Sequence, residues 1–151
     1  MSLREHFTQS MKDAMKAGDK TRLGAIRLIQ ATLKDRDIEA RGAGKEVSDD
    51  DILAMLQKMI KSRQESLAMY EQAGREDLAA QERGEIAVIQ DFLPAQMSDE
   101  DVKVAIAAAI SETGASAMKD MGKVVAALKA KFTGQMDFAK ASALVKAALN
   151  G

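Results

Sequence analysis

The sequence predicts an all-α protein, with a four-helix N-terminal domain and a smaller three-helix C-terminal domain. Three observations support this fold class. The chain has one proline in 151 residues and is rich in helix-forming residues. Its apolar residues recur at spacings of three and four. Serine or aspartate caps precede the periodic segments and glycines follow them, while no alternating stretch long enough for a strand is present.

The first two helices are expected on either side of Gly18. Ser2 opens the first helix, whose apolar face is formed by Leu3, Phe7, Met11 and Ala14. Asp19 caps the second helix, which repeats Leu23, Ile26, Gln30 and Leu33 at helical spacing. A glycine-containing loop is expected over residues 41–47.

The third and fourth helices are predicted to form a long hairpin. Ser48 caps the third helix, and three aspartates fill its first turn, where the helix dipole favours negative charge. This helix should run to about Ala73 and stop at Gly74. The fourth should run over 76–92 and end before Pro94. We place the domain boundary at this proline, which gives an N-terminal domain 1–94 and a C-terminal domain 95–151.

Three further helices are expected after the boundary. The run SDED at 98–101 opens the fifth helix, which should end near Gly114. The sixth should begin around 119–120 and stop before Gly134. Asp137 should cap the seventh, which runs to the end of the sequence.

Three charged residues fall inside the apolar stripes of the predicted hairpin. Arg63 interrupts the stripe of the third helix, and Glu82 and Glu85 interrupt that of the fourth. Since Arg63 and Glu85 are equally far from Gly74, an antiparallel hairpin brings them to the same level. We predict a partly buried structural ion pair between Arg63 and Glu85 or Glu82. A metal site is not expected, because the single histidine, His6, has no Glu-x-x-His partner.

The composition excludes several kinds of chemistry. No cysteine is present for a disulfide, a thiolate nucleophile or a cysteine-ligated zinc. The stretch RGAGK at 41–45 lacks the spacing and the preceding strand of a phosphate loop, so we expect no cofactor. With no cysteine, one histidine and no G-x-S-x-G motif, we expect no catalytic residues. No apolar run could cross a bilayer, and the first 16 residues are unlike a signal peptide. A cytoplasmic protein without a membrane partner is therefore expected.

The C-terminal part is unevenly charged. Residues 1–93 carry 15 Lys and Arg against 17 Asp and Glu, whereas residues 117–151 carry 6 Lys against 2 Asp. On the sixth helix the apolar stripe should have Lys119 and Lys123 opposite it and Lys129 and Lys131 on its flanks, and the seventh helix should leave Lys140 and Lys146 outside. Such a set is either a solvated helix face or a surface that attracts phosphates.

Several stretches resemble the GatB/YqeY family, among them LKDRDIEARG (33–42), DFLPAQMS (91–98) and a longer segment over 120–149. That last segment is similar to the tail of the B subunit of glutamine-dependent aminoacyl-tRNA amidotransferase. The resemblance implies an all-α fold and tail lysines that contact a tRNA backbone. Gly122 would then allow close approach of a partner or a neighbouring helix. One departure is Val125-Ala126, where the tail usually has Met-Gly.

Three functions follow as expectations. The first is a module without catalysis of its own that contacts tRNA, or a tRNA-handling enzyme, through the C-terminal lysines. The second is an accessory component of a carbon–nitrogen ligase that uses glutamine as amide donor. It would be active only with partner chains, because the large catalytic domain of the amidotransferase has no counterpart here. The third is a protein-interaction module that uses the N-terminal helices. The sequence defines no oligomeric state.

Overall fold

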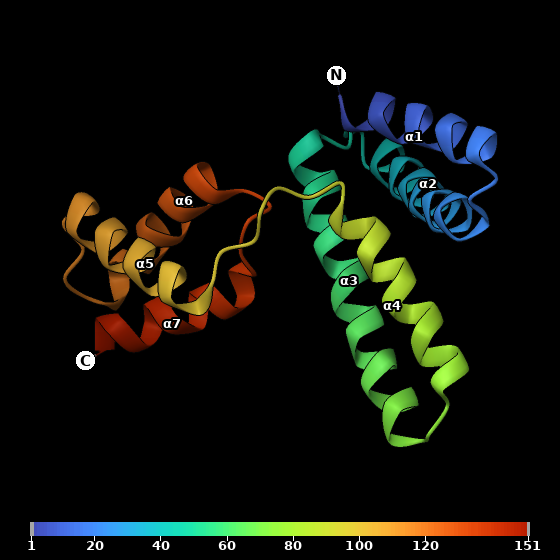
Figure 1. The fold of residues 1–151 in the computed structure, drawn as a ribbon. Coiled ribbons are helices and arrows are strands. Elements are labelled where there is room, and N and C mark those ends of the chain that lie inside the picture. The colour runs from blue at the N-terminus through green and yellow to red at the C-terminus, as the bar shows by residue number, and fades with distance from the viewer. Residues whose placement is uncertain (1, 151) are drawn as a thin grey trace. The chain divides into compact units, whose positions relative to one another are not determined.

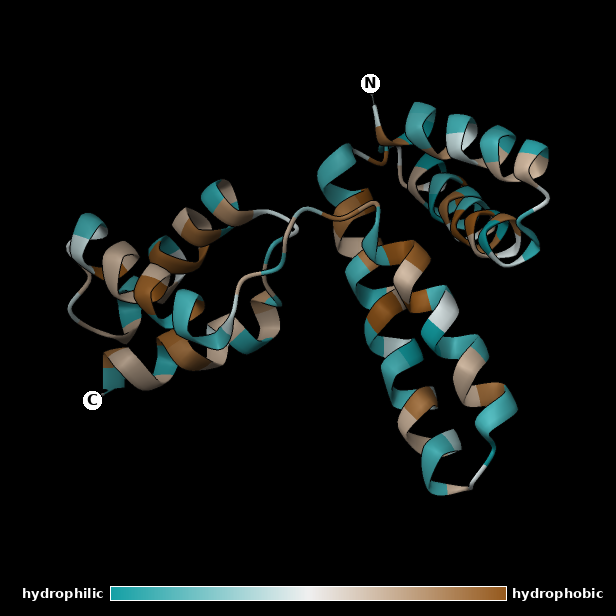
Figure 2. Ribbon diagram, viewed as in Figure 1, coloured by the Kyte–Doolittle hydropathy of each residue, from teal (hydrophilic) through white to brown (hydrophobic). Residues whose placement is uncertain are grey.

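The computed structural model describes residues 2–150, which form seven α-helices and one short 3-10 helix, with no β-strand in that range (Figure 1). The predicted all-α class is therefore confirmed. The chain divides into two compact units, Met1–Leu93 and Pro94–Gly151, each with its own apolar core. Within each unit the brown, apolar stretches of the ribbon lie mostly on helix sides that face other helices (Figure 2).

Helices α1 (Leu3–Ala17) and α2 (Lys20–Gly42) form the first antiparallel pair. The chain reverses at Gly18, whose φ of 68° is a left-handed value that glycine adopts without steric strain. Helix α2 continues to Gly42, so the loop starts later than the predicted Arg41. The reason is the closing turn, in which Lys45 N–H donates to Ala40 O at 2.8 Å and Gly44 takes a φ of 70°.

Helices α3 (Asp49–Gln72) and α4 (Glu76–Gln90) form the long hairpin. Ser48 and Asp51 begin α3 with a capping box, each side chain accepting a hydrogen bond from the other residue's backbone N–H. Helix α4 ends two residues before the predicted Phe92. Pro94 disfavours helical backbone in the residue before it, and the chain leaves α4 through turns over residues 91–93.

The core of the first unit lies where all four helices meet. Fully buried side chains come from every helix of the unit: Phe7, Ile26, Ile29, Ile52, Leu56 and Ile89. Phe92 closes one edge, with its ring 5.0 Å from Phe7 in an edge-to-face contact. The hairpin turn lies away from α1 and α2 (Figure 1).

The second unit contains α5 (Asp99–Thr113), the 3-10 helix η1 (Met118–Asp120), α6 (Met121–Phe132) and α7 (Phe138–Asn150). The predicted start of the sixth helix at 119–120 is therefore the 3-10 turn, and α6 begins at Met121. The Asp120 carboxylate accepts backbone hydrogen bonds from Ser116 and Ala117, which closes this turn ahead of α6. The core of this unit is formed by buried residues of α5, α6 and α7 together with Met136: Val102, Ala105, Ile106, Ala109, Val124, Leu128, Met136, Ala141 and Val145.

Candidate functional site

The charged residues of the hairpin lie in the seam between α3 and α4. Arg63 Nε donates a hydrogen bond to Glu85 Oε2 at 3.0 Å, and the two side chains are 18% and 14% exposed. Arg63 Nη1 also donates to the Met59 carbonyl at 3.4 Å. Gln81 Nε2 lies 3.4 Å from Glu85 Oε1. The guanidinium is therefore engaged by one carboxylate and one backbone oxygen.

Glu82 is the member of this group whose carboxylate has an unsatisfied oxygen. Its Oε2 atom is buried and accepts no hydrogen bond from the described residues. Burial raises the pKa of the Glu82 carboxyl, and the neighbouring charge of Glu85 raises it further, while Arg63 acts in the opposite direction. Two carboxylates thus share a single cation. Within residues 2–150 no group of three or more His, Cys, Asp or Glu side chains could hold a metal ion.

The C-terminal lysines are exposed, but two of them have acidic partners in the same unit. Lys131 Nζ lies 3.4 Å from Glu112, and Lys140 Nζ lies 3.9 Å from Asp99. Backbone N–H donation from Ser116 is the main cause that lowers the pKa of Asp120. The charges of Lys123 and Lys119 contribute to the same shift. The positive charge is therefore partly offset within the unit.

Lys129, Lys146 and Gly122 complete the set assigned to nucleic-acid contact. Both lysines are exposed on α6 and α7. A Cβ built on Gly122 would meet no heavy atom within 4 Å, so no neighbouring helix in the described part of the chain requires this glycine.

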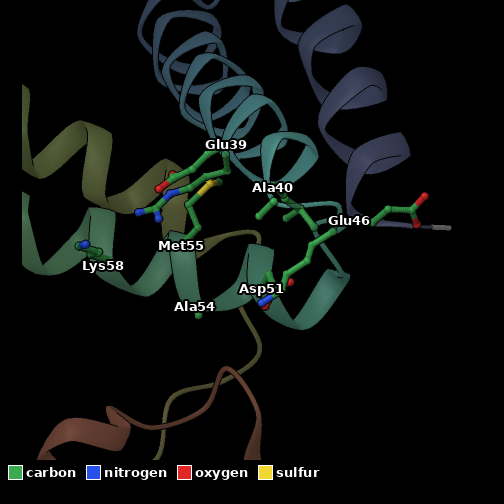
Figure 3. Close-up of a pocket in the computed structure, with 11 residues that line it drawn as sticks. Glu39, Ala40, Glu46, Asp51, Ala54, Met55 and Lys58 are labelled. Atoms are coloured by element: carbon green, nitrogen blue, oxygen red, sulfur yellow. The ribbon is translucent and has the colours of Figure 1, made fainter.

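A groove between α2 and α3 is the feature that the sequence did not indicate. It has a volume of about 440 Å3, and its walls come from the C-terminal half of α2, the following loop and the N-terminal half of α3. Figure 3 shows the Met55 side chain directed from α3 toward Glu39 and Ala40 of α2. The groove exists because α2 packs mainly on α1 and α4 and touches α3 at few positions. This packing is a tertiary property that helix periodicity does not report.

The groove combines an apolar floor with a rim of both charges. Met55, only 5% exposed, and Val47 contribute to the floor, together with Ala40, Ala43 and Ala54. The rim carries three cations, Arg36, Lys45 and Lys58, and three acids, Glu39, Glu46 and Asp51. Asp51 is held in the capping box, where hydrogen bonds from Ser48 lower its pKa.

A second cavity, of about 560 Å3, shares Lys45, Glu46 and Val47 with the groove. Its lining is largely polar and includes Arg4 and Asp37. These two side chains form a bidentate pair, with Nη–Oδ distances of 2.9 and 2.7 Å. Because Arg4 already holds a carboxylate, this cavity offers less unpaired charge than its number of basic residues suggests.

Comparison with known proteins identifies a family that spans nearly the whole chain and relatives that match part of it. A family model described as Yqey-like protein matches residues 4–149. "Altered inheritance of mitochondria protein 41, mitochondrial" from Pyrenophora tritici-repentis is 33% identical over 128 residues, which cover 80% of this chain and 68% of the relative. The protein of that name from Eremothecium gossypii is 32% identical over 90 residues, 60% of this chain and 48% of the relative. The chain thus spans about half the length of the latter relative.

These matches contradict two expectations. The tRNA-associated function is wrong as stated, because the similar proteins carry a name that refers to inheritance of mitochondria, and the tRNA-binding and amidotransferase-like descriptions find no support. The family match also extends over 4–149, whereas the amidotransferase resemblance used for function concerned only the tail. The assignment of individual lysines to phosphate contacts stays a prediction.

The cytoplasmic location is contradicted as well, since these relatives are named as mitochondrial. The expectation relied on the absence of an apolar run that could cross a bilayer and of a secretory signal, and neither observation separates cytoplasmic from mitochondrial proteins. In the described part of the chain, no helix has both the length and the apolar character needed to cross a membrane.

Proposed function

We propose that the first unit of this chain, which belongs to the YqeY-like family by a match over residues 4–149, binds a ligand in the groove between α2 and α3. The proposed ligand is amphiphilic, with an apolar body and both a positive and a negative group. The observation that carries this proposal is the apolar floor around Met55 bordered by three cations and three acids.

The shape of the groove favours a ligand of limited size. Its volume of about 440 Å3 lies within the range of about 300–1,000 Å3 typical of ligand pockets. Met55 is only 5% exposed, so the apolar surface that a ligand would remove from water belongs mainly to Val47 and to the exposed Ala43 and Ala54. The methionine side chain also adapts its shape to different apolar partners.

The rim favours a ligand that carries both charges. Arg36 and Lys58 come from the two helices that form the walls, and no ion pair occupies either of them within residues 2–150. These groups suit a carboxylate. Glu39, on α2, suits an ammonium group. A ligand with a single sign of charge would leave half of the rim without a complementary partner.

Two sources supply this chemistry, and binding measurements distinguish them. A free zwitterion such as leucine carries an apolar body, an ammonium and a carboxylate. A peptide segment with Leu and Met between Lys and Glu carries the same groups on a longer body. Binding of unlabelled leucine is measured by calorimetry, and binding of the dye-labelled peptide by fluorescence polarisation, with the full-length protein in both cases. Saturable binding of either probe is expected, and the probe that binds more tightly identifies the source.

Blocking the groove provides the control. Ala54 is exposed in the groove, so Ala54→Arg should fill it without disturbing the core. We expect Ala54→Arg to weaken binding by about tenfold or more, equivalent to about 1.4 kcal/mol. The matched variant Ala31→Arg, on the exposed face of α2 outside the groove, should bind as the unchanged protein does. Absence of saturable binding by both probes, or equal weakening by both variants, would refute the proposal.

We also propose that the two units fold as separate domains, the four helices before Pro94 and the three after it. Separate apolar cores in the two units support this proposal. The test is thermal unfolding of residues 95–151 produced alone. A cooperative transition close to one seen in the full-length chain is expected, whereas a fragment without such a transition would contradict the division.

A further inference from the structure

The distal hairpin, residues 64–81, is the part of the first unit that the shared core covers least. The buried core residues of α3 end at Ile60, and those of α4 in the same cluster begin at Ile86. Between these levels Ala79 is buried, while Leu67, Tyr70 and Leu78 are only half-buried. Segments with few buried apolar contacts open at a lower free energy than the rest of a domain.

Ion pairs at the tip contribute little to holding this segment closed. Arg83 reaches Glu71 across the hairpin at 3.1 Å and Glu76 on its own helix at 2.6 Å. All three side chains are about half exposed or more, and exposed pairs of this kind contribute about 0–1 kcal/mol. The seam next to Arg63 therefore has a large influence on whether the distal hairpin stays closed.

We propose that the distal hairpin is a proton-controlled element, which opens more readily when Glu82 loses its proton. Glu82 faces the Arg63–Glu85 pair, and its buried Oε2 atom has no hydrogen-bond partner among the described residues. The geometry explains the effect. Arg63 directs Nε to Glu85 and Nη1 to the Met59 carbonyl. An ionised Glu82 thus adds a second negative charge to a seam with one cation, and the buried Oε2 atom of this half-buried side chain has no hydrogen bond to replace its lost hydration.

The charged groups that act on Glu82 come from the two helices of the hairpin. They are Arg63 on α3 and Glu85 on α4. The side chain of Gln81, which lies next to Glu85, is neutral. The other close element is α2, which approaches α4 at Gly84 through the uncharged Thr21, so no further cation from α2 offsets the negative charge.

The direction of the pH dependence follows from the pKa of Glu82, which burial raises above its ordinary value. A carboxyl of this kind favours the closed form while it is protonated. The contribution of protonated Glu82 to the stability of the closed hairpin is complete below the ordinary carboxyl pKa, and it is lost as the pH rises through the raised pKa of Glu82. The distal hairpin should therefore be most tightly closed in mildly acidic solution and should loosen toward neutral pH.

Hydrogen exchange of the full-length protein, read by mass spectrometry, tests this proposal. Protection factors, which correct for the intrinsic pH dependence of exchange, are compared for peptides in residues 64–81 between about pH 4 and about pH 8, a range that brackets a raised carboxyl pKa. They are expected to fall severalfold as the pH rises. In Glu82→Gln, which keeps the size of the side chain but cannot ionise, they should change little with pH. The matched variant Glu65→Gln, at an exposed position of α3, should behave as the unchanged protein does.

Two outcomes would overturn the proposal: protection that does not change with pH in the unchanged protein, or the same pH dependence in Glu82→Gln. If Glu82→Gln does not fold, carboxyl-carbon NMR of the unchanged protein gives the answer. The Glu82 resonance should titrate at higher pH than that of exposed Glu65, and titration of both at the same pH would reject the proposal.

Discussion

Replacement of Arg63 by methionine should destabilise the first unit by leaving two carboxylates in the seam without a cation. Removing one partner of a fully buried ion pair costs about 3–5 kcal/mol. The Arg63 and Glu85 side chains keep 18% and 14% of their exposure, so water reduces this cost. We expect a loss of about 2 kcal/mol in the free energy of unfolding, because the methionine retains the apolar packing of the arginine stem.

Urea unfolding followed by circular dichroism measures this loss. Fluorescence of Tyr70, the only tyrosine in the sequence, reports the distal hairpin in the same experiment. A companion variant that adds Glu85→Gln to Arg63→Met should recover about 1 kcal/mol, because it removes one of the stranded charges. A loss below about 0.5 kcal/mol, the size seen for exposed pairs, would refute the reasoning, as would a companion variant no more stable than Arg63→Met alone.

Three further predictions concern helix ends and glycines. Gly24→Ala should stabilise the protein by about 1 kcal/mol in thermal unfolding, because Gly24 lies inside α2 and a Cβ there meets no atom within 4 Å; a lower melting temperature would contradict this. Gly114→Ala should instead destabilise the protein by about 1 kcal/mol, because the φ of 68° at Gly114, which ends α5, disfavours any residue with a Cβ. An unchanged midpoint of urea unfolding would disprove this expectation. Ser48→Ala should cost about 1 kcal/mol through loss of the α3 cap. The Asp51 pKa is lowered mainly by the Ser48 backbone N–H, which alanine keeps, and to a lesser extent by the Ser48 side chain, which alanine lacks. The stabilisation due to the side chain is present above the ordinary aspartate pKa and is lost as the pH falls through the lowered value. Unfolding curves at several acidic pH values should show the difference between Ser48→Ala and the unchanged protein shrinking, and a constant difference would count against this account.

Helix positions follow well from local signals in the sequence, and helix ends follow less well. Ser2, Asp19, Ser48 and Ser98 act as caps because their side-chain oxygens accept a backbone N–H three residues later, and these positions are visible as sequence patterns. The end of α4 is different, since the effect of Pro94 reaches back over turns whose length no pattern reports.

The candidate site, too, could be predicted from the sequence only in part. The equal spacing of Arg63 and Glu85 from Gly74 indicates their level in an antiparallel hairpin, and the two side chains lie 3.0 Å apart. That Glu82 would be the carboxylate without a partner depends on rotamers and could not be read from spacing. The groove depends on how α2 diverges from α3, which is decided by packing among four helices.

The tRNA-associated function expected from the lysines is contradicted by the names of the relatives, and the structure shows why the charge counts behind it are weak evidence. Charge counts in a sequence do not show which cations already have partners, and two of the six lysines lie beside acids of their own unit, Glu112 and Asp99. A modest excess of positive charge is also compatible with an ordinary solvated surface.

The most direct test of the proposed function is a map of the ligand's position on the protein. Amide chemical shifts of the full-length chain are followed by NMR during titration with the Lys- and Glu-flanked peptide, or with leucine if that is the tighter ligand. Saturable shifts are expected at Ala40, Val47, Ala54 and Met55 around the groove, and none of comparable size on the exposed face of α2 around Ala31. Shifts that are spread over the surface without saturation, or that gather outside the groove, would contradict it.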